Sequence, residues 1–290
     1  MNQPKVTVIG SINMDLFTTV DELPQQGETI FGKDYFMTPG GKGANQAIAA
    51  AKLGADVCFL GKVGKDLMGK KLLNYFEEEN FNYSMIEIDA EASTGIANVI
   101  LNNKDNRIMV VPGANSNVTV DFIKKYKHRI LTSDVILAQL EIPIETVEWC
   151  ANLCARESIP FILNPAPSRA LSSSLIENCT YITPNEEEAR KVFSIEHIVN
   201  DYSSKLITTL GPRGAMYNGT IIPTYKSKVT DTTGAGDTFN GALAYFLGSG
   251  YVIEEAITHA NIAASYSVEY FGAQQGMPSY DQVKQRYRVC

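Results

Sequence analysis

The sequence has few of the residues that build disulfide frameworks or zinc sites. Its 290 residues include five cysteines, an odd number, and no two of them are separated by the two-residue gap of common zinc motifs. The three histidines are scattered, and no metal-ligand motif surrounds any of them. We therefore expect reduced thiols, and we interpret Cys150 and Cys154, which would share one face of a helix, as small apolar residues facing a core.

Long apolar runs and an excess of basic residues are also absent. The stretch from 44 to 60 is cut by Lys52, Gly54 and Asp56, whereas a membrane span needs about 18 consecutive apolar residues. A formal net charge of -7 argues against a nucleic-acid surface, which would need clustered Lys and Arg. Because the N-terminus also lacks the features of a secretory signal, the sequence predicts a cytoplasmic protein without a membrane or nucleic-acid partner.

Strand-like and helical segments alternate along most of the chain, and 44% hydrophobic residues are enough to bury a full core. Continuous runs of Val, Ile and Leu between amphipathic helices are typical of strands buried on both faces. The sequence therefore predicts an α/β fold with a doubly wound, mostly parallel sheet, formed as one domain over residues 1–290. Strands are expected at 6–9, 57–60, 135–140, 161–163, 181–183 and 206–209, and helices at 44–53, 66–79, 145–157 and 252–270.

Two segments, 16–38 and 93–112, break this alternation. In the second, two apolar runs at 97–101 and 107–111 flank the turn-forming residues 103–106. We expect the two segments to form one small antiparallel sheet that projects from the main domain.

The strongest local signal is the sequence DTTGAGDTFNG at 231–241, in which two glycines and a small residue open an apolar helix. The amides of Ala235, Gly236 and Asp237 are expected to be unpaired donors at the positive end of the helix dipole, which is a ready anion-binding site. The small residues before Asp237 would permit close approach of a phosphate.

Asp237 has two interpretations at this helix start. A carboxylate beside a phosphate site repels the phosphate, yet it stands where an incoming hydroxyl needs its proton accepted as it attacks. This favours Asp237 as a general base. The alternative is that Asp237 merely caps the helix, because Asp is common at helix starts, and one glycine-rich loop is weak support for either role.

Two further polar segments are expected near the carboxyl edge of the sheet, where open α/β sheets bind their ligands. GGKGANQA at 40–47 leads into an Ala-rich helix but lacks the spacing of mononucleotide and dinucleotide motifs. We interpret it as a close backbone approach to a small polar ligand, with Asn45 facing its hydroxyls. GSINMD at 10–15 follows the first strand, and Glu141 closes the strand that begins at 135.

Taken together, these segments resemble the ribokinase-like, or pfkB, family of carbohydrate kinases over nearly the whole chain. So many matches in the same order are far more specific than any one of them. They are GSINMD at 10–15, GGKGANQA at 40–47, GKVGKD at 61–66, PGAN at 112–115, AQLE at 138–141, NPAP at 164–167, TPNEEE at 183–188 and DTTGAGDTFNGA at 231–242.

The resemblance implies phosphorylation of O5 of D-ribose by ATP, with Mg²⁺, a monovalent cation such as K⁺, and Asp237 as the catalytic base. The small sheet would be a lid, and two lids would pair in a homodimer. The sugar-binding positions would be Asn13, Asp15, Gly41, Lys42, Asn45, Glu141 and Asp237. The positions for the nucleotide and the magnesium waters would be Asn185, Glu188, Thr209, Gly211, Gly214, Ala235, Gly236 and Asn261. Those for the monovalent cation would be Asp231, Thr233, Ser267, Tyr270, Gly272 and Gly276.

Two departures from the family pattern concern the sheet and the cation site. The connection 190–205 is shorter than is usual for the family, but it exceeds the roughly one dozen residues that a parallel crossover needs. We therefore expect the topology to survive with a shortened helix and a less well covered sheet face. Gly276 stands where the family commonly has Ser, which would remove one side-chain ligand of the cation.

Other substrates and another class of function stay open at this point. The same chemistry could act on deoxyribose, fructose or a nucleoside, although Asp15, Gly41 and Asn45 favour a small polyhydroxylated sugar. A sugar-binding regulatory protein that has kept the fold without activity is the remaining alternative. Asp237 and the glycines before it argue against that alternative.

Overall fold

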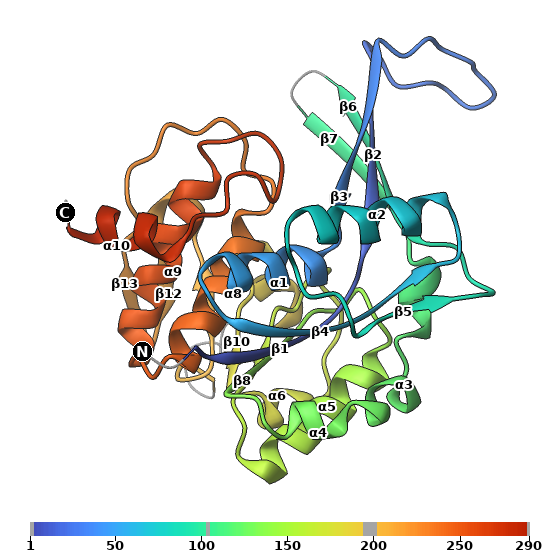
Figure 1. The fold of residues 1–290 in the computed structure, drawn as a ribbon. Helices are drawn as coiled ribbons and strands as arrows, with labels where there is room; N and C mark the ends of the chain where they lie inside the picture. The colour runs from blue at the N-terminus through green and yellow to red at the C-terminus, as the bar shows by residue number, and fades with distance from the viewer. Residues whose placement is uncertain (1–2, 103–104, 194–201, 289–290) are drawn as a thin grey trace.

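Six parallel strands form the main sheet of the computed structural model, which describes residues 3–102, 105–193 and 202–288 (Figure 1). Their order in space is β10-β9-β8-β1-β4-β5. Every neighbouring pair in this order runs parallel, so the predicted α/β class with a parallel sheet is confirmed. The bounds are β1 Lys5–Ile9, β4 Asp56–Gly64, β5 Ile86–Asp89, β8 Val135–Ala138, β9 Phe161–Leu163 and β10 Tyr181–Ile182.

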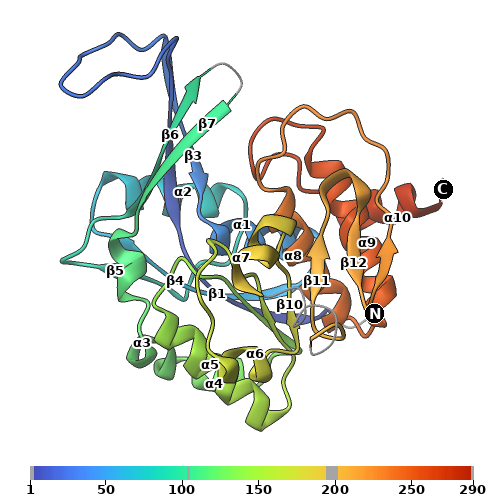
Figure 2. The same ribbon diagram turned by 180° about the vertical axis from the view of Figure 1, so that it is seen from behind.

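Helices cover both faces of this sheet, as the doubly wound class requires (Figures 1 and 2). Strand β8 shows why its apolar run is continuous, because Val135 and Leu137 pack into the core on one face while Ile136 and Ala138 pack into the core on the other. One face carries α1 Lys42–Lys52, α2 Leu67–Glu78, α8 Ala235–Gly248, α9 Ile253–Ser267 and α10 Tyr280–Arg288. The other carries α3 Val120–Lys125, α4 Lys127–Ile130, α5 Ile144–Glu157 and α6 Ser173–Asn178.

A short antiparallel sheet continues the main sheet beyond β10. Its strands are β11 Ile207–Thr209, β12 Ala215–Tyr217 and β13 Thr220–Ile222. Parallel bridges from Ile182 to Leu206 and from Asn185 to Thr209 place β11 beside β10, so the crossover predicted for the short connection is present. Helix α7 Glu186–Val192 begins that crossover. Residues 194–201, which belong to the connection, lie outside the described part of the chain.

The two segments predicted to form a small sheet do so, and this projecting sheet rises away from the main body in Figures 1 and 2. It contains β2 Asn13–Thr19, β3 Asp34–Gly40, β6 Gly95–Asn102 and β7 Asp105–Val111 in the order β3-β2-β6-β7. The outer pairs are antiparallel as expected, but β2 and β6 run parallel. Strands β2 and β6 are each the first strand of a hairpin, and both hairpins leave the main body in the same direction. The two strands therefore begin side by side and run parallel. Residues 103–104 of the predicted turn lie outside the described residues.

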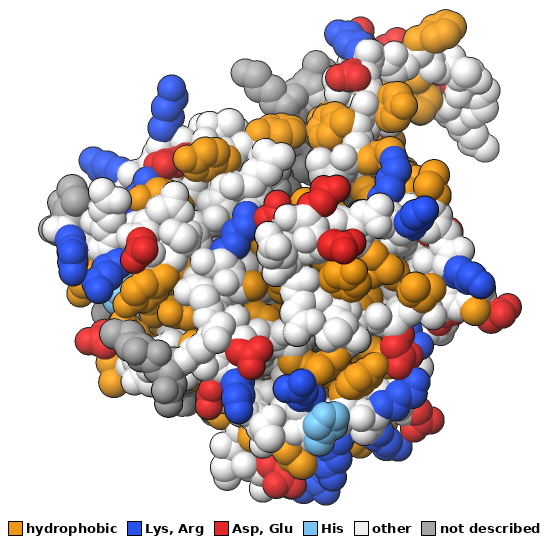
Figure 3. Space-filling view, in the orientation of Figure 1, with side chains coloured by type: hydrophobic (Ala, Val, Ile, Leu, Met, Phe, Trp, Pro, Cys, Tyr) orange, Lys and Arg blue, Asp and Glu red, His pale blue; other side chains and the backbone are white. Residues whose placement is uncertain are grey.

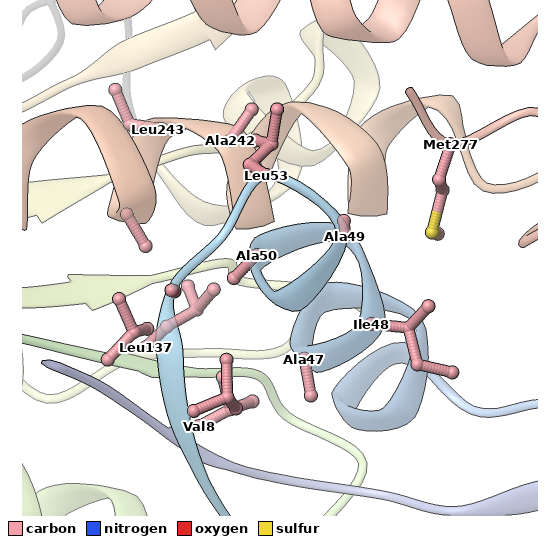
Figure 4. Close-up of a cluster of buried hydrophobic side chains, with 14 of the residues drawn as sticks. Val8, Ala47, Ile48, Ala49, Ala50, Leu53, Leu137, Ala242, Leu243 and Met277 are labelled. Atoms are coloured by element: carbon pink, nitrogen blue, oxygen red, sulfur yellow. The ribbon is translucent and has the colours of Figure 1, made fainter. Parts of the chain in front are cut away.

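Helices α1 and α8 meet through small residues, among them Ala49 and Ala50 of α1 and Ala242 of α8 (Figure 4). A Cβ atom at Gly241 would lie 2.5 Å from the carbonyl oxygen of Gln46 and 2.6 Å from the Cβ atom of Ala49. Because real Cβ atoms do not approach so closely, this contact requires glycine at 241. The close contact brings the polar first half of α1 against the start of α8.

Candidate active site

The end of β1 lies directly against the first turn of α1. The amide of Ala44 donates to the carbonyl oxygen of Ser11 at 2.9 Å, and the amide of Gly43 donates to Ser11 Oγ at 3.3 Å. A Cβ atom at Gly43 would lie 2.5 Å from the backbone of this segment, and Gly41 has a φ of 89°. The glycines of GGKGANQA therefore bring two parts of the chain together, and their approach to a ligand stays a prediction.

Glu141, in the bend that follows β8, and Asn13, the first residue of β2, face this junction. The Oε2 atom of Glu141 accepts hydrogen bonds from Ser11 Oγ at 2.5 Å and from the amide of Lys42 at 3.2 Å. The Oδ1 atom of Asn13 accepts from Asn115 Nδ2 at 2.8 Å. Sequence reasoning assigns no role to Ser11 or Asn115, although both stand inside matched motifs, and the structure shows that they orient residues of the predicted sugar site.

Asp237 lies in the first turn of α8 and is 8% exposed. Its carboxylate accepts hydrogen bonds from Asn45 Nδ2 at 2.9 Å and from Gln46 Nε2 at 3.0 Å. The N-cap of α8 is Gly234, which has a left-handed conformation and makes no side-chain cap. The capping interpretation of Asp237 is therefore wrong, and the carboxylate instead faces the side chains of α1.

Asn45 is committed to the protein more fully than predicted. Its Nδ2 atom donates to Asp237, and its Oδ1 atom accepts from Gln274 Nε2 at 2.7 Å. An amide side chain carries two N–H donors, so one donor of Asn45 remains for a ligand.

Several charged side chains share this partly dry region. Burial, the charge of Glu141 and the charge of Asp237 raise the pKa of Asp15 from 3.8 to about 7. Burial also raises the pKa of Asp237, against the opposing charge of Lys42. Burial alone would lower the pKa of Lys42, but the charges of Asp237, Glu141 and Glu188 outweigh it and raise that pKa. The carboxylates and the ammonium group are thus electrostatically coupled.

The first turn of α8 offers two free backbone amides to an anion. The amide of Ala235 donates to the carbonyl oxygen of Thr232 at 3.2 Å, so the prediction of an unpaired donor is wrong there. The amides of Gly236 and Asp237 have no hydrogen-bond acceptor among the described residues. A Cβ atom at Gly236 would meet no atom within 4 Å, which leaves space for a phosphate beside the positive end of the helix.

Asn185 and Glu188 form the start of α7. The amide of Asn185 donates to Glu188 Oε2 at 2.9 Å, and the amide of Glu188 donates to Asn185 Oδ1 at 2.8 Å. This reciprocal cap holds both side chains in place. The bridge between Asn185 and Thr209 brings two predicted nucleotide residues together, and the charge of Lys42 acts on Glu188 from the sugar side.

The other predicted nucleotide residues lie near β11 and β13. Gly211 is exposed, with a φ of 57° and no atom within 4 Å of a Cβ atom placed there. Gly214 is buried, and a Cβ atom there would lie 2.7 Å from the amide of Thr224. Asn261 donates to the carbonyl oxygen of Ile222 at 2.9 Å, so its amide group holds the end of β13. Gly211 is thus open to a ligand, whereas Gly214 and Asn261 shape the surrounding backbone.

Two loops meet where the monovalent cation is predicted. Asp231 Oδ1 accepts from the amide of Thr233 at 2.9 Å and from its hydroxyl at 2.7 Å, and Oδ2 accepts from the amide of Gly272 at 2.9 Å. The amide of Tyr270 donates to the carbonyl oxygen of Ser267 at 3.3 Å. Gly276 lies in the same place, because a Cβ atom there would be 2.9 Å from the Cα atom of Ser267. A serine at 276 would therefore require the backbone to move.

Two hollows of the described surface lie away from all these residues. One is at the amino ends of β1 and β4 and is lined by Thr7 and Cys58, and the other lies between α5 and α6 and is lined by Trp149 and Ser172. In the described ranges, no three His, Cys, Asp or Glu side chains gather as ligands for a metal ion. No helix in those ranges is long and apolar enough to span a membrane.

Comparison with known proteins places these residues in a family. Residues 3–280 match the model of the pfkB family carbohydrate kinase. A ribokinase of Lactococcus lactis is 42% identical over 98% of this chain and 97% of its own length, and one of Bacillus subtilis is 43% identical over 97% of this chain and 98% of its own. The structure of Arabidopsis thaliana ribokinase complexed with ribose and ATP superposes with a TM-score of 0.87 at 28% identity, covering 98% of each chain.

The raised pKa of Asp15 makes stability depend on pH. The folded protein holds this proton more tightly than the unfolded chain, so stability falls as the pH rises from 3.8 to about 7. We predict that Asp15→Asn raises the free energy of unfolding at pH 8, by up to about 4 kcal/mol, and that the gain shrinks towards pH 4.

Urea unfolding at several pH values without ligands measures this effect. Glu78→Gln, which changes an exposed carboxylate on α2, serves as the control. A gain for Asp15→Asn that is equal at pH 4 and pH 8 would contradict the prediction.

Proposed function

Because this chain belongs to the pfkB family of carbohydrate kinases, we propose that it transfers the γ-phosphoryl group of ATP to O5 of D-ribose. The observation that carries the proposal is the carboxylate of Asp237, which is buried next to free helix-start amides and held by two side-chain donors. The two ribokinases at 42% and 43% identity, and the ribokinase structure with ribose and ATP, support ribose as the acceptor.

Asp237 is the general base in this proposal. Its carboxylate accepts the proton of the sugar hydroxyl as that hydroxyl attacks the γ-phosphorus. The free amides of Gly236 and Asp237 donate to the oxygens of the transferred group, where charge is spread in the transition state. Positioning and charge stabilisation supply most of the acceleration, because phosphoryl transfer leaves little covalent work to the protein.

The sugar is held at the junction of β1, β2 and α1. Asp15 and Asn13 supply acceptors for hydroxyls, and the ammonium group of Lys42 supplies donors. Glu141 holds the amide of Lys42 and so fixes the start of α1 around the sugar. Gly41 permits the tight turn into that helix.

Two ions belong to the proposed reaction. Magnesium, when bound with ATP, neutralises charge on the phosphates, and Asn185 and Glu188 would hold its waters. The fixed carboxylate of Glu188 fits this task, because Mg²⁺ usually takes one or two protein carboxylates together with phosphates and waters. Potassium would be held between the two loops that Asp231 joins, where its carboxylate accepts from the amides of Thr233 and Gly272.

We further propose that the projecting sheet is a lid and that two copies pair through it. Hydrophobic side chains reach its surface in Figure 3. The edge strand β7 exposes four consecutive apolar residues on both of its faces, Ile108, Met109, Val110 and Val111. An exposed apolar edge strand is a ready partner for another strand, so a second copy of this chain would cover it.

Met109→Lys should therefore shift the mass in solution from two chains to one, since it places a charge in the covered edge. Light scattering beside Ile221→Lys, a matched change at an exposed residue of β13, measures the shift. A mass of two chains for Met109→Lys, or a mass of one chain for the wild type, would contradict pairing through β7.

The substrate is tested by release of ADP with a panel of ribose, deoxyribose, fructose and adenosine. We predict that ribose has the highest kcat/KM and that the product is the 5-phosphate.

Chelation of Mg²⁺ should abolish turnover, and replacement of K⁺ by tetramethylammonium at equal ionic strength should lower it.

A tenfold preference for fructose or adenosine, which is about 1.4 kcal/mol in the barrier, would overturn the assignment of ribose. Binding of ribose without any sugar-dependent release of ADP would favour the silent sugar-binding protein instead.

A further inference from the structure

Three buried amide side chains near Asp237 have no role in the sugar and nucleotide contacts proposed above. Gln46 and Gln139 are each 0% exposed, and Asn164 is 7% exposed. Gln46 is on α1, Gln139 follows β8 and Asn164 follows β9, so they come from three elements at the carboxyl edge of the sheet. Their motifs were recognised as a match, but the proposed function uses only the hydrogen bond from Gln46 to Asp237 and gives Gln139 and Asn164 no role.

The hydrogen bonds of Gln46 can point only one way. Its Nε2 atom donates to Asp237 Oδ1 at 3.0 Å and to Asn164 Oδ1 at 3.1 Å, and its Oε1 atom accepts from Gln139 Nε2 at 2.6 Å. An ionised carboxylate can only accept, so the NH₂ end of Gln46 must face Asp237. Turning the amide over would place two acceptor oxygens against each other in a dry region, which is costly.

The orientation of Gln139 follows from that of Gln46. Because Gln46 presents its oxygen, Gln139 must present its NH₂ group. This leaves Oε1 of Gln139 buried without a donor among the described residues, packed where a Cβ atom of Gly10 would otherwise stand. An unsatisfied buried oxygen destabilises a protein. Its presence here indicates that the hydrogen bond from the NH₂ group of Gln139 to Gln46 outweighs that cost.

We propose that Gln46, held in one orientation by Gln139, is a positioning residue that keeps Asp237 ionised and directs it for proton transfer. This inference rests on the proposed function, in which Asp237 is the base. Gln46 binds one carboxylate oxygen, while Asn45, oriented by Gln274, binds the other. Each oxygen keeps a lone pair, so the carboxylate is fixed in its plane and still accepts a proton.

Gln46→Met should therefore change the pH dependence of the reaction. Burial and the charge of Glu141 raise the pKa of Asp237, whereas the charge of Lys42 and the donors of Asn45 and Gln46 lower it. Loss of the Gln46 donor should therefore raise this pKa further. The acid limb of kcat/KM for ribose should move to higher pH by about one unit, while activity above that limb recovers to within a few fold of the wild type.

Gln139→Met is the second variant, because it leaves the Gln46 side chain in place but no longer fixes its orientation. We expect a smaller shift of the acid limb in the same direction. Gln285→Met, at an exposed position of α10, is the matched control and should leave the profile unchanged.

Carbon-13 NMR titration of the aspartate carboxylates gives the pKa of Asp237 without turnover, with Asp237→Asn identifying its signal.

A uniform loss of activity at every pH, with an unmoved pKa of Asp237, would overturn the inference and leave Gln46 with only a structural role. If Gln46→Met does not fold, an unmoved acid limb in Gln139→Met overturns it equally. The proposed function and this inference can fail separately. If the wild type phosphorylates ribose and the variants keep its pH profile, only the inference about Gln46 is wrong. Absence of turnover with ribose removes the proposed function.

Discussion

The burial of one carboxylate against two amide side chains, at the point where α1 meets α8, is the constraint around which the site is arranged. Gly241 and the alanines between the two helices let their backbones approach closely enough for Asn45 and Gln46 to reach Asp237. The same approach places the start of α8, with its free amides, beside the first half of α1. Helix packing therefore also sets the surroundings of the Asp237 carboxylate.

A buried negative charge is unfavourable unless other groups compensate for it. Here the positive end of α8, the ammonium group of Lys42 and the donors of Asn45 and Gln46 all act on Asp237. Compensation is incomplete, since the pKa of Asp237 stays raised. This balance suits a general base, which has to hold its proton during the transfer and lose it afterwards.

Much of the fold could be predicted because its causes are local. Runs of Val, Ile and Leu mark strands buried on both faces, and β9 was predicted with its observed bounds. The parallel pairing of β2 with β6 could not be predicted, because it depends on how two hairpins far apart in sequence leave the main body. Asp237 could be singled out by its glycine-rich helix start, whereas Ser11 and Gln46 could not, because their hydrogen bonds depend on side chains from other elements.

The account as a whole depends on Asp237 being the base, and the most direct test is kcat of Asp237→Asn measured together with its dissociation constant for ribose. Asn keeps the size of Asp but cannot accept a proton at neutral pH. The account predicts that kcat falls by about 10²- to 10⁴-fold while the folded variant still binds ribose. A folded variant that binds ribose and keeps more than about a tenth of the wild-type kcat would contradict it.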